Sequence, residues 1–316
     1  MNILVTGGLG FIGSNFILYI QENHPDVKIT NIDAKLEGSN EANLRQLKKK
    51  NYRFVYGNIT NQRLMDKLVA DSDVVFNFAA ESHVDRSITN PKSFIDSNIM
   101  GVHVVLESIR KYKRKLIQIS TDEVFGSLNT GSATEKHILN PSSPYSSSKA
   151  SAELLVKSYC VTYGIDAIIT RCTNNYGPRQ SLEKLIPKVI TLANKNRKIP
   201  VYGTGKNIRD WIFVKDHCDA VFKVFEEGKW GDSYNIAGNT ELDNNMIIKK
   251  ILTIMEKPLT LINYVKDRPG HDFRYSLNSS KIRKQLLWKP KYKLEKGLKE
   301  TIEWYLENMK FFQSKY

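Results

Sequence analysis

A short strand, three closely spaced glycines and then a helix limit the fold of this chain more than any other feature. Residues 3–6 form a compact apolar run, and Gly7, Gly10 and Gly13 follow it before a helical pattern begins. Glycines at these positions let the backbone turn tightly, approach a pyrophosphate closely and pack a helix against a sheet. The N-terminus of that helix adds positive potential. This arrangement predicts the first strand, turn and helix of a dinucleotide-binding fold.

The next strand supplies the second half of this signal. Residues 27–32 are predicted to form a strand that ends in Asp33. Asp33 lies about 20 residues beyond the last glycine, which is the spacing of the dinucleotide fingerprint. A carboxylate there accepts hydrogen bonds from the adenosine ribose hydroxyls and repels a 2′-phosphate. We therefore predict that the cofactor is NAD rather than NADP.

Apolar strands continue to alternate with helical patterns along the first half of the chain. Strands are predicted at residues 52–56, 74–78, 116–120 and 167–170, and helices at residues 62–68, 94–112 and from Tyr145 onward. Such alternation is typical of βαβ units. The prediction is an α/β fold with a Rossmann-type doubly wound parallel sheet.

The pattern changes after Arg171. Residues 174–178 are predicted to form a turn cluster, and the elements beyond them are shorter and mixed. Helices are predicted at residues 182–194, 216–226, 244–255 and 294–308, and strands at residues 199–202 and 233–236. We predict an NAD-binding Rossmann domain over residues 1–171 and a smaller mixed α/β substrate-binding domain over residues 172–316. Elements near residues 212–237 are expected to return to the first domain.

Composition and charge argue against several classes of protein. The chain has 316 residues, of which 41% are hydrophobic and 25% charged, so we expect an ordered globular protein. Its net charge of +14 is carried by scattered lysines, which favours a solvated surface that attracts anionic substrates over a nucleic-acid partner. Three cysteines without metal-like spacing predict a reducing compartment and no metal site. With no signal peptide and no apolar run of about 18 residues, we expect a cytoplasmic protein without a membrane partner.

Two segments carry candidate reactive groups. Residues 117–126 predict a buried strand with Thr121, Asp122 and Glu123 at its C-terminal end, where a parallel sheet opens onto a ligand crevice. Tyr145 and Lys149 are four residues apart, a spacing that brings both onto one face of a helix. A lysine near a tyrosine hydroxyl favours the phenolate, so Tyr145 is expected to act as a base well below its unperturbed pKa of about 10. A Tyr-x-x-x-Lys pair also occurs by chance on many helices.

Taken together, the motifs resemble those of the extended short-chain dehydrogenase/reductase family, and within it the nucleotide-diphosphoglucose 4,6-dehydratases. The resemblance covers nearly the whole chain and rests on residues 6–14, 79–87, 120–126, 145–149, 171–178, 209–211 and 267–271. Epimerases and decarboxylases of the same superfamily share the glycine and Tyr/Lys motifs. The Thr-Asp-Glu triplet at residues 121–123 is the specific signal, because a dehydratase must eliminate water and an epimerase need not.

The resemblance implies a three-step reaction on dTDP-glucose or UDP-glucose. Tyr145, activated by Lys149, takes the proton of the C4 hydroxyl while hydride passes to NAD, and Thr121 hydrogen-bonds that oxygen. Glu123 then removes the C5 proton and Asp122 protonates the departing C6 hydroxyl, which requires different environments for the two carboxyl groups. Hydride returns to C6 and yields the NDP-4-keto-6-deoxyglucose and water. The expected enzyme is an NAD-dependent hydro-lyase.

The resemblance also assigns binding residues. The positions that match cofactor contacts are Gly7, Gly10, Phe11, Ile12, Gly13, Asp33, Asn58, Ile59, Ala79, Ala80, Tyr145, Lys149 and Asn175. The positions that match sugar-nucleotide contacts are Ser82, Asn174, Lys184, Leu185, Pro200, Val201, Tyr202, Arg209, Asn244, Arg268 and His271. Arg209 and Arg268 are the expected pyrophosphate ligands, because a guanidinium binds phosphate through two parallel hydrogen bonds.

The chain departs from the family pattern at a few positions. Asn58 precedes Ile59 where the family usually has aspartate, Ser181 and Leu182 replace a Phe-Pro pair, and Phe125 replaces a common tyrosine. These positions lie on the nucleotide side or in loops, so the reaction class is unchanged. They leave open whether the preferred base is thymine or uracil.

Two other functions stay open at this point. A UDP-sugar 4-epimerase or a UDP-glucuronate decarboxylase would use the same Tyr145 and Lys149 but would need no acid–base pair at Asp122 and Glu123. A catalytically silent NAD-sensing or nucleic-acid-binding protein would commonly have lost Tyr145 or Lys149. The resemblance further implies a homodimer packed through the helices at residues 94–112 and 145–163.

Overall fold

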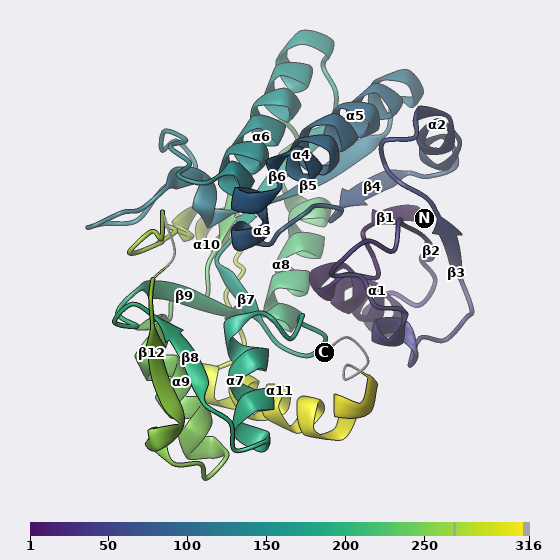
Figure 1. The fold of residues 1–316 in the computed structure, drawn as a ribbon. Coiled ribbons are helices and arrows are strands. Elements are labelled where there is room, and N and C mark those ends of the chain that lie inside the picture. Colours follow the sequence, from purple (N-terminus) through teal and green to yellow (C-terminus); the bar gives the residue numbers. More distant parts are fainter. Residues whose placement is uncertain (268–269, 312–316) are drawn as a thin grey trace.

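A seven-stranded parallel sheet forms the centre of the protein (Figure 1). The computed structural model describes residues 1–267 and 270–311. The strand order is β10-β6-β5-β4-β1-β2-β3, and all neighbouring pairs are parallel. The strands are β1 (Asn2–Thr6), β2 (Lys28–Asp33), β3 (Tyr52–Tyr56), β4 (Val74–Asn77), β5 (Lys115–Thr121), β6 (Ala167–Cys172) and β10 (Ser233–Ile236). The predicted doubly wound sheet is confirmed, since the order 3-2-1-4-5-6 is that of dinucleotide-binding folds.

Helices cover both faces of this sheet (Figure 1). The first face carries α1 (Phe11–Asn23), α8 (Val214–Glu227) and α10 (Ser280–Gln285), and the second carries α2 (Gln62–Ala70), α5 (Gly101–Tyr112) and α6 (Pro144–Tyr163). No helix in the described part of the chain combines the length and apolar character of a membrane span.

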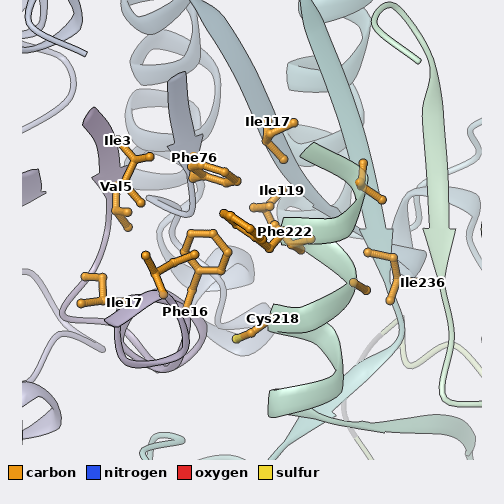
Figure 2. Close-up of a cluster of buried hydrophobic side chains, with 14 of the residues drawn as sticks. Ile3, Val5, Phe16, Ile17, Phe76, Ile117, Ile119, Cys218, Phe222 and Ile236 are labelled. Carbon is orange, nitrogen blue, oxygen red and sulfur yellow. The ribbon is translucent and has the colours of Figure 1, made fainter. Parts of the chain in front are cut away.

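Successive residues of β1 show how the two layers of core arise. Ile3 and Val5 belong to the apolar cluster under α1 and α8, whereas Leu4 belongs to the cluster under α2 and α5, because neighbouring side chains of a strand point to opposite faces. Figure 2 shows the first cluster, in which the rings of Phe16 and Phe76 lie 4.7 Å apart between centroids. Burying a side chain of this kind contributes about 1.5–3 kcal/mol. The sheet edge that carries the site is therefore held from both sides.

The second half of the chain builds a smaller mixed α/β unit, which lies below the main sheet in Figure 1. It contains one three-stranded sheet of order β11-β9-β7 and one two-stranded sheet of β12 and β8. Its elements are β7 (Asn174–Tyr176), β8 (Ile199–Tyr202), β9 (Ile208–Phe213), β11 (Glu241–Asp243), β12 (Ile262–Val265), α7 (Leu185–Asn194), α9 (Asn244–Ile254) and α11 (Leu294–Asn308). Apolar side chains of the three helices and of β8 and β9 form one buried cluster.

Three elements of the second half, β10, α8 and α10, belong to the main sheet or to the helices that cover it. β10 pairs with β6 in parallel, with Ser233 opposite Ile169 and Ile236 opposite Cys172. Helix α8 packs against α1 and places Cys218 and Val221 in the same apolar cluster as β1. The chain therefore crosses between the two units more than once.

The predicted turn cluster at residues 174–178 is wrong. Asn174–Tyr176 form strand β7, which pairs in parallel with β9 and places Asn174 opposite Trp211. The turn follows only at Gly177, whose φ is +147°. Asparagine and glycine predicted a turn from local preference, but the partner strand some 35 residues further along overrides that preference.

The helical stretch predicted at residues 94–112 is confirmed, and it contains one π-helical turn. Helix α4 (Pro91–Ile95) runs through one π-helical turn, η2 (Asp96–Met100), into α5. Asn98 in that turn is buried, and its amide donates to the Glu81 carbonyl (3.0 Å) and the Ser148 hydroxyl (2.8 Å). The remaining short elements are α3 (Val84–Thr89), η1 (Glu41–Leu44), η3 (Asp122–Phe125), η4 (Leu259–Leu261) and η5 (Met309–Phe311).

A fully buried ion pair ties α6 to β6. Glu153 accepts hydrogen bonds from Nε (2.9 Å) and Nη2 (2.6 Å) of Arg171, and both side chains are 0% exposed. The guanidinium also lies over the ring of Phe125, 4.9 Å from its centroid. When one partner of such a pair is removed, the charge of the other stays buried without compensation.

Glu153→Gln is therefore expected to lower the free energy of unfolding by about 3–5 kcal/mol, measured by denaturant titration. Glu227→Gln is the matched control, because it removes the half-exposed partner of Lys223 in an ordinary surface pair, for which the expected change is below about 1 kcal/mol. Equal losses in the two variants would contradict the role given to burial.

Candidate active site

Two adjoining cavities lie where the parallel strands end. The first is lined by residues that follow β1, β2, β3, β4, β5 and β6, which is the edge at which open α/β sheets bind ligands. The second lies between this edge and the smaller unit, and residues of α7, β8 and β9 form part of its lining. Glu123, Asn174, Glu183 and Lys184 line both cavities. One ligand can therefore extend from the main sheet into the smaller unit.

The glycine turn at the start of α1 brings backbone against backbone. Gly7 has a φ of +68°, and a Cβ on it would lie 2.7 Å from the Cα of Ala79. A Cβ on Gly13 would lie 2.4 Å from the carbonyl oxygen of Gly7. Side chains at these positions would force the turn open. Gly10 is the N-cap of α1 and supplies no side-chain cap, so the helix N-terminus at the first cavity is available to an anionic group.

Asp33 stands at the end of β2, buried in the wall of the first cavity. Its carboxylate accepts hydrogen bonds from the backbone N–H groups of Leu9 (3.0 Å) and Lys35 (2.8 Å) and from the hydroxyl of Ser39 (2.8 Å). A carboxylate offers about four acceptor positions, so capacity remains for a ligand hydroxyl. The bond from Leu9 also fixes Asp33 relative to the glycine turn.

All positions that matched cofactor contacts come together around the first cavity. Its lining includes Gly7, Gly10, Phe11, Ile12, Gly13, Asp33, Asn58, Ile59, Ala79, Ala80, Tyr145, Lys149 and Asn175. Cys172, Thr173 and Gln180 line it too. The first two lie in the motif at residues 171–178 but were not assigned a contact, and no sequence pattern indicated Gln180. The Oδ1 atom of Asn175 is buried without a hydrogen-bond partner among the described residues, which leaves a polar atom for a ligand to satisfy.

The triplet after β5 stands at the junction of the two cavities. The Thr121 hydroxyl accepts from the backbone N–H of Glu123 (3.3 Å) and donates to Oδ1 of Asp122 (3.1 Å). Thr121 and Asp122 are buried, whereas Glu123 is half-buried and lines both cavities. The turn η3 thus directs two adjacent carboxyl groups into different surroundings.

Asp122 is a carboxyl group that holds its proton at neutral pH. Burial, and next the negative charge of Glu123, raise the pKa of Asp122 to about 8, against the lowering effects of the Thr121 hydrogen bond and the Arg209 charge. Its Oδ2 atom is buried and has no hydrogen-bond partner in the described part of the chain. A neutral carboxyl group beside a cavity can donate a proton to a leaving oxygen.

Tyr145 and Lys149 both project into the first cavity from α6, as their spacing predicted. The Lys149 ammonium donates to the carbonyl of Ile119 (2.7 Å), and burial lowers the pKa of Lys149 to about 8. Burial, and next the charge of Glu123, raise the pKa of Tyr145 well above its ordinary value. The expected lowering of the Tyr145 pKa is not found, because desolvation by burial outweighs the lowering effect of the hydrogen bond with Thr121.

Most positions that matched sugar-nucleotide contacts line the second cavity. These are Asn174, Lys184, Leu185, Pro200, Val201, Tyr202, Arg209, Asn244 and His271. Ser82 lines the first cavity instead, and its carbonyl accepts a hydrogen bond from Nζ of Lys184 (3.0 Å). Arg268, the second expected pyrophosphate ligand, lies outside the described residues.

Arg209, an expected pyrophosphate ligand, is also bound to neighbouring groups of the protein. Its Nη1 donates to the carbonyl of Ile208 (2.7 Å), and its Nη2 donates to the carbonyl of Asp272 (2.9 Å). The guanidinium lies over the ring of Tyr275, 4.3 Å from the centroid. Arg209 therefore supports the loop that carries Asp272 as well as lining the cavity.

Tyr275 is a cavity residue that no sequence pattern indicated. It is buried and lines the second cavity. Its hydroxyl lies 2.7 Å from Oδ2 of Asp272 and 3.5 Å from Oε2 of Glu123. Burial, and next the charge of Glu123, raise the pKa of Tyr275 far above its ordinary value, so the phenol is neutral. A tyrosine in a loop 152 residues from its partner carries no local signal.

The groups that line the first cavity suit a dinucleotide. The glycine turn admits a group where any Cβ would clash, Asp33 keeps acceptor capacity, and the Asn175 oxygen lacks a partner among the described residues. Within residues 1–267 and 270–311, no group of three or more His, Cys, Asp or Glu side chains is arranged to hold a metal ion.

The parallel sheet, the glycine turn and the Tyr145–Lys149 pair define an extended short-chain dehydrogenase/reductase. A family model described as GDP-mannose 4,6 dehydratase matches residues 4–301, and the chain belongs to this family. It is 45% identical to the low-salt glycan biosynthesis protein Agl12 of Haloferax volcanii over 97% of this chain and 99% of that protein. It is 42% identical to a dTDP-glucose 4,6-dehydratase of Mycobacterium tuberculosis over 98% of this chain and 94% of that protein.

Solved structures separate the rival activities by degree of similarity. The dTDP-glucose 4,6-dehydratase DesIV of Streptomyces venezuelae, solved with NAD bound, is 39% identical and superposes with a TM-score of 0.97 over 99% of both chains. A UDP-glucose 4-epimerase of Thermotoga maritima is 28% identical, with a TM-score of 0.91 over 98% of this chain and 100% of that chain. The fold is common to both activities.

Asp122→Asn is expected to stabilise the protein increasingly as pH rises from about 4 to 8. The pKa of Asp122 is raised from 3.8 to about 8 in the folded state, so the folded protein binds the proton more tightly and wild-type stability falls across this window. The amide cannot ionise and escapes that loss. Denaturant unfolding at several pH values measures the gap, expected to exceed about 2 kcal/mol at pH 8.

Asp26→Asn is the control for the change in net charge, because Asp26 is exposed and lies in the loop before β2. A gap between Asp122→Asn and wild type that stays constant with pH would show that Asp122 is not held neutral.

Proposed function

We propose that this chain is an NAD-dependent hydro-lyase that converts dTDP-glucose to dTDP-4-keto-6-deoxyglucose and water. Membership of the 4,6-dehydratase family supports this proposal, as do full-length relatives named dTDP-glucose 4,6-dehydratase. The observation that carries it is the pair of carboxyl groups at residues 122 and 123. Asp122 is buried, with its pKa raised to about 8, beside a half-buried Glu123 that lines both cavities.

The two carboxyl groups suit the two proton transfers of an elimination. Asp122, which holds its proton at neutral pH, would protonate the departing C6 hydroxyl. Glu123 would remove the C5 proton, which a ketone at C4 makes acidic. Thr121 would hydrogen-bond the oxygen at C4. An epimerase needs neither the proton transfer assigned to Asp122 nor the one assigned to Glu123. The presence of both carboxyl groups therefore favours the dehydratase over the 4-epimerase or decarboxylase.

NAD would be held in the first cavity by the glycine turn, Asp33 and Asn175, and when bound it supplies reversible hydride exchange with the sugar. Tyr145, activated by Lys149, would take the proton of the C4 hydroxyl. The ammonium group of Lys149 would be held in place by its hydrogen bond to the Ile119 carbonyl (2.7 Å).

We propose that the two halves of the chain divide the binding. Residues 1–171, with β10 and α8, would bind NAD, and the remainder of residues 172–316 would bind the sugar nucleotide. The side chains proposed to contact the sugar nucleotide are Ser82, Asn174, Lys184, Leu185, Pro200, Val201, Tyr202, Arg209, Asn244, Arg268 and His271. The basic surface of a chain with net charge +14 favours a substrate with a negatively charged pyrophosphate.

Incubation with dTDP-glucose is expected to give the 4-keto-6-deoxy product, identified by mass spectrometry and by its absorbance in alkali. A parallel incubation with UDP-glucose tests the base preference. Glu123→Gln is expected to lower kcat by about 100-fold or more, because it removes the base for C5. A product that keeps its C6 hydroxyl, such as UDP-galactose, would instead identify an epimerase.

We further propose that the protein forms a homodimer through α5 and α6 and acts in the cytoplasm on a route to deoxysugars. Large apolar side chains are exposed on this part of the surface: Leu154 is 58%, Val161 is 88% and Met100 is 49% exposed. Leu154 and Val161 are seven residues apart and lie on one side of α6.

The three unpaired cysteines, Cys160, Cys172 and Cys218, suit a reducing compartment.

Val161→Asp is expected to convert the dimer to a monomer, measured as halved mass by light scattering, because a charge at the centre of an apolar contact loses its hydration. Ile138→Asp is the matched control: Ile138 is 83% exposed but lies outside these helices, so the mass is expected to stay that of the dimer. A wild-type protein that is already monomeric would refute the proposed assembly.

A further inference from the structure

The hydroxyl of Tyr275 lies between two half-buried carboxylates, those of Asp272 and Glu123. It is 2.7 Å from Oδ2 of Asp272 and 3.5 Å from Oε2 of Glu123. The Oδ2 atom of Asp272 also accepts a hydrogen bond from the hydroxyl of Ser142, which is exposed. Tyr275 itself is 4% exposed. The chain of contacts therefore runs from the cavity through a buried phenol to the protein surface.

The phenol has the right hydrogen-bonding capacity to carry a proton along this chain. It has one hydrogen and two acceptor positions, and the shorter contact directs the hydrogen to Asp272. Its oxygen can then accept from Glu123 whenever Glu123 is protonated. Tyr275 is fixed for this task by the guanidinium of Arg209, which lies 4.3 Å from the ring centroid and also donates to the Asp272 carbonyl.

Glu123 needs such a path if it is the base of the proposed reaction. It lines both cavities, so a substrate that fills them covers its cavity side. The proton taken from C5 can then leave through hydrogen-bonded groups of the protein. Tyr275, in the wall of the second cavity, hydrogen-bonds Glu123 and also contacts Asp272.

We propose that Tyr275 and Asp272 form a proton path that connects Glu123 with solvent, an inference that rests on the proposed function. The O–H bond of protonated Glu123 breaks as its proton bonds to the Tyr275 oxygen. The original Tyr275 O–H bond breaks at the same time, and that proton bonds to Oδ2 of Asp272. Glu123 is left as a carboxylate, Tyr275 is again a neutral phenol, and Asp272 releases the proton to water at the side of Ser142. The same transfers in reverse bring a solvent proton to Glu123, and this proton bonds to C5 when hydride has returned to C6.

The test follows hydrogen at C5 of the product. The cofactor-loaded protein converts dTDP-glucose in D₂O, and mass spectrometry with NMR measures the deuterium at C5. The wild type is expected to place solvent deuterium there. Asp272→Asn is expected to lower the deuterium at C5 by about threefold or more, because the trapped proton returns to the carbon from which it came. A substitution that merely slows a later step gives the abstracted proton more time to exchange, so it does not lower this isotope content.

Two further variants make the test decisive. Tyr275→Phe keeps the ring beside Arg209 and removes only the hydroxyl, so it is expected to give the same loss of deuterium even if Asp272→Asn does not fold. Glu241→Gln is the matched control. Glu241 accepts from Ser276 (2.6 Å) and pairs with Arg274 (2.8 Å), so it anchors the same loop outside the path, and its product is expected to keep wild-type deuterium.

Different results would contradict the proposed function and the proton path. No 4-keto-6-deoxy product from the wild type would overturn the proposed function itself. A normal product that carries wild-type deuterium in both Asp272→Asn and Tyr275→Phe, or no deuterium at C5 in the wild type, would overturn the proton path alone.

Discussion

The parallel pairing of β5 with its two neighbours is the constraint on which the candidate site depends. β5 pairs with β6 in a register that places Thr121 opposite Cys172, and with β4 in a register that places Gln118 opposite Asn77. All strands of the sheet therefore end at one edge, and groups far apart in the sequence meet there. A slip of one residue would turn Thr121 to the other face of the sheet and would separate it from the cavity.

Depth below the surface gives two adjacent carboxyl groups different chemistry. Asp122 is 4% exposed, and burial together with the charge of Glu123 raises its pKa to about 8. Glu123 is the next residue, yet it lies at the junction of two cavities and contacts the hydroxyl of Tyr275. The same charge on Glu123 that helps to keep Asp122 neutral also raises the pKa of Tyr145. An acid and a base can therefore be made from one dipeptide.

Short-range sequence patterns predicted the features that depend on the spacing of neighbouring residues. The spacing of the glycines and Asp33 predicted the first cavity, and the four-residue spacing of Tyr145 and Lys149 placed both on α6. β7 was missed because its partner strand is distant in sequence, and local preference for a turn gave no hint of that pairing. The Tyr145 pKa was misjudged because desolvation depends on everything packed around the phenol. The roles assigned to single residues stay predictions.

The segment at residues 270–277 explains why the second cavity could not be derived from local signals. Its backbone is bound to both units: the Leu128 N–H donates to the Arg274 carbonyl (2.9 Å), and the Ile208 N–H donates to the Phe273 carbonyl (2.8 Å). This loop joins the turn after β5 to the start of β9, and it carries Tyr275 into contact with Glu123. The loop has no strand or helix pattern of its own, because its conformation is imposed by these partners. A site wall built in this way can be recognised only after the two units have been brought together.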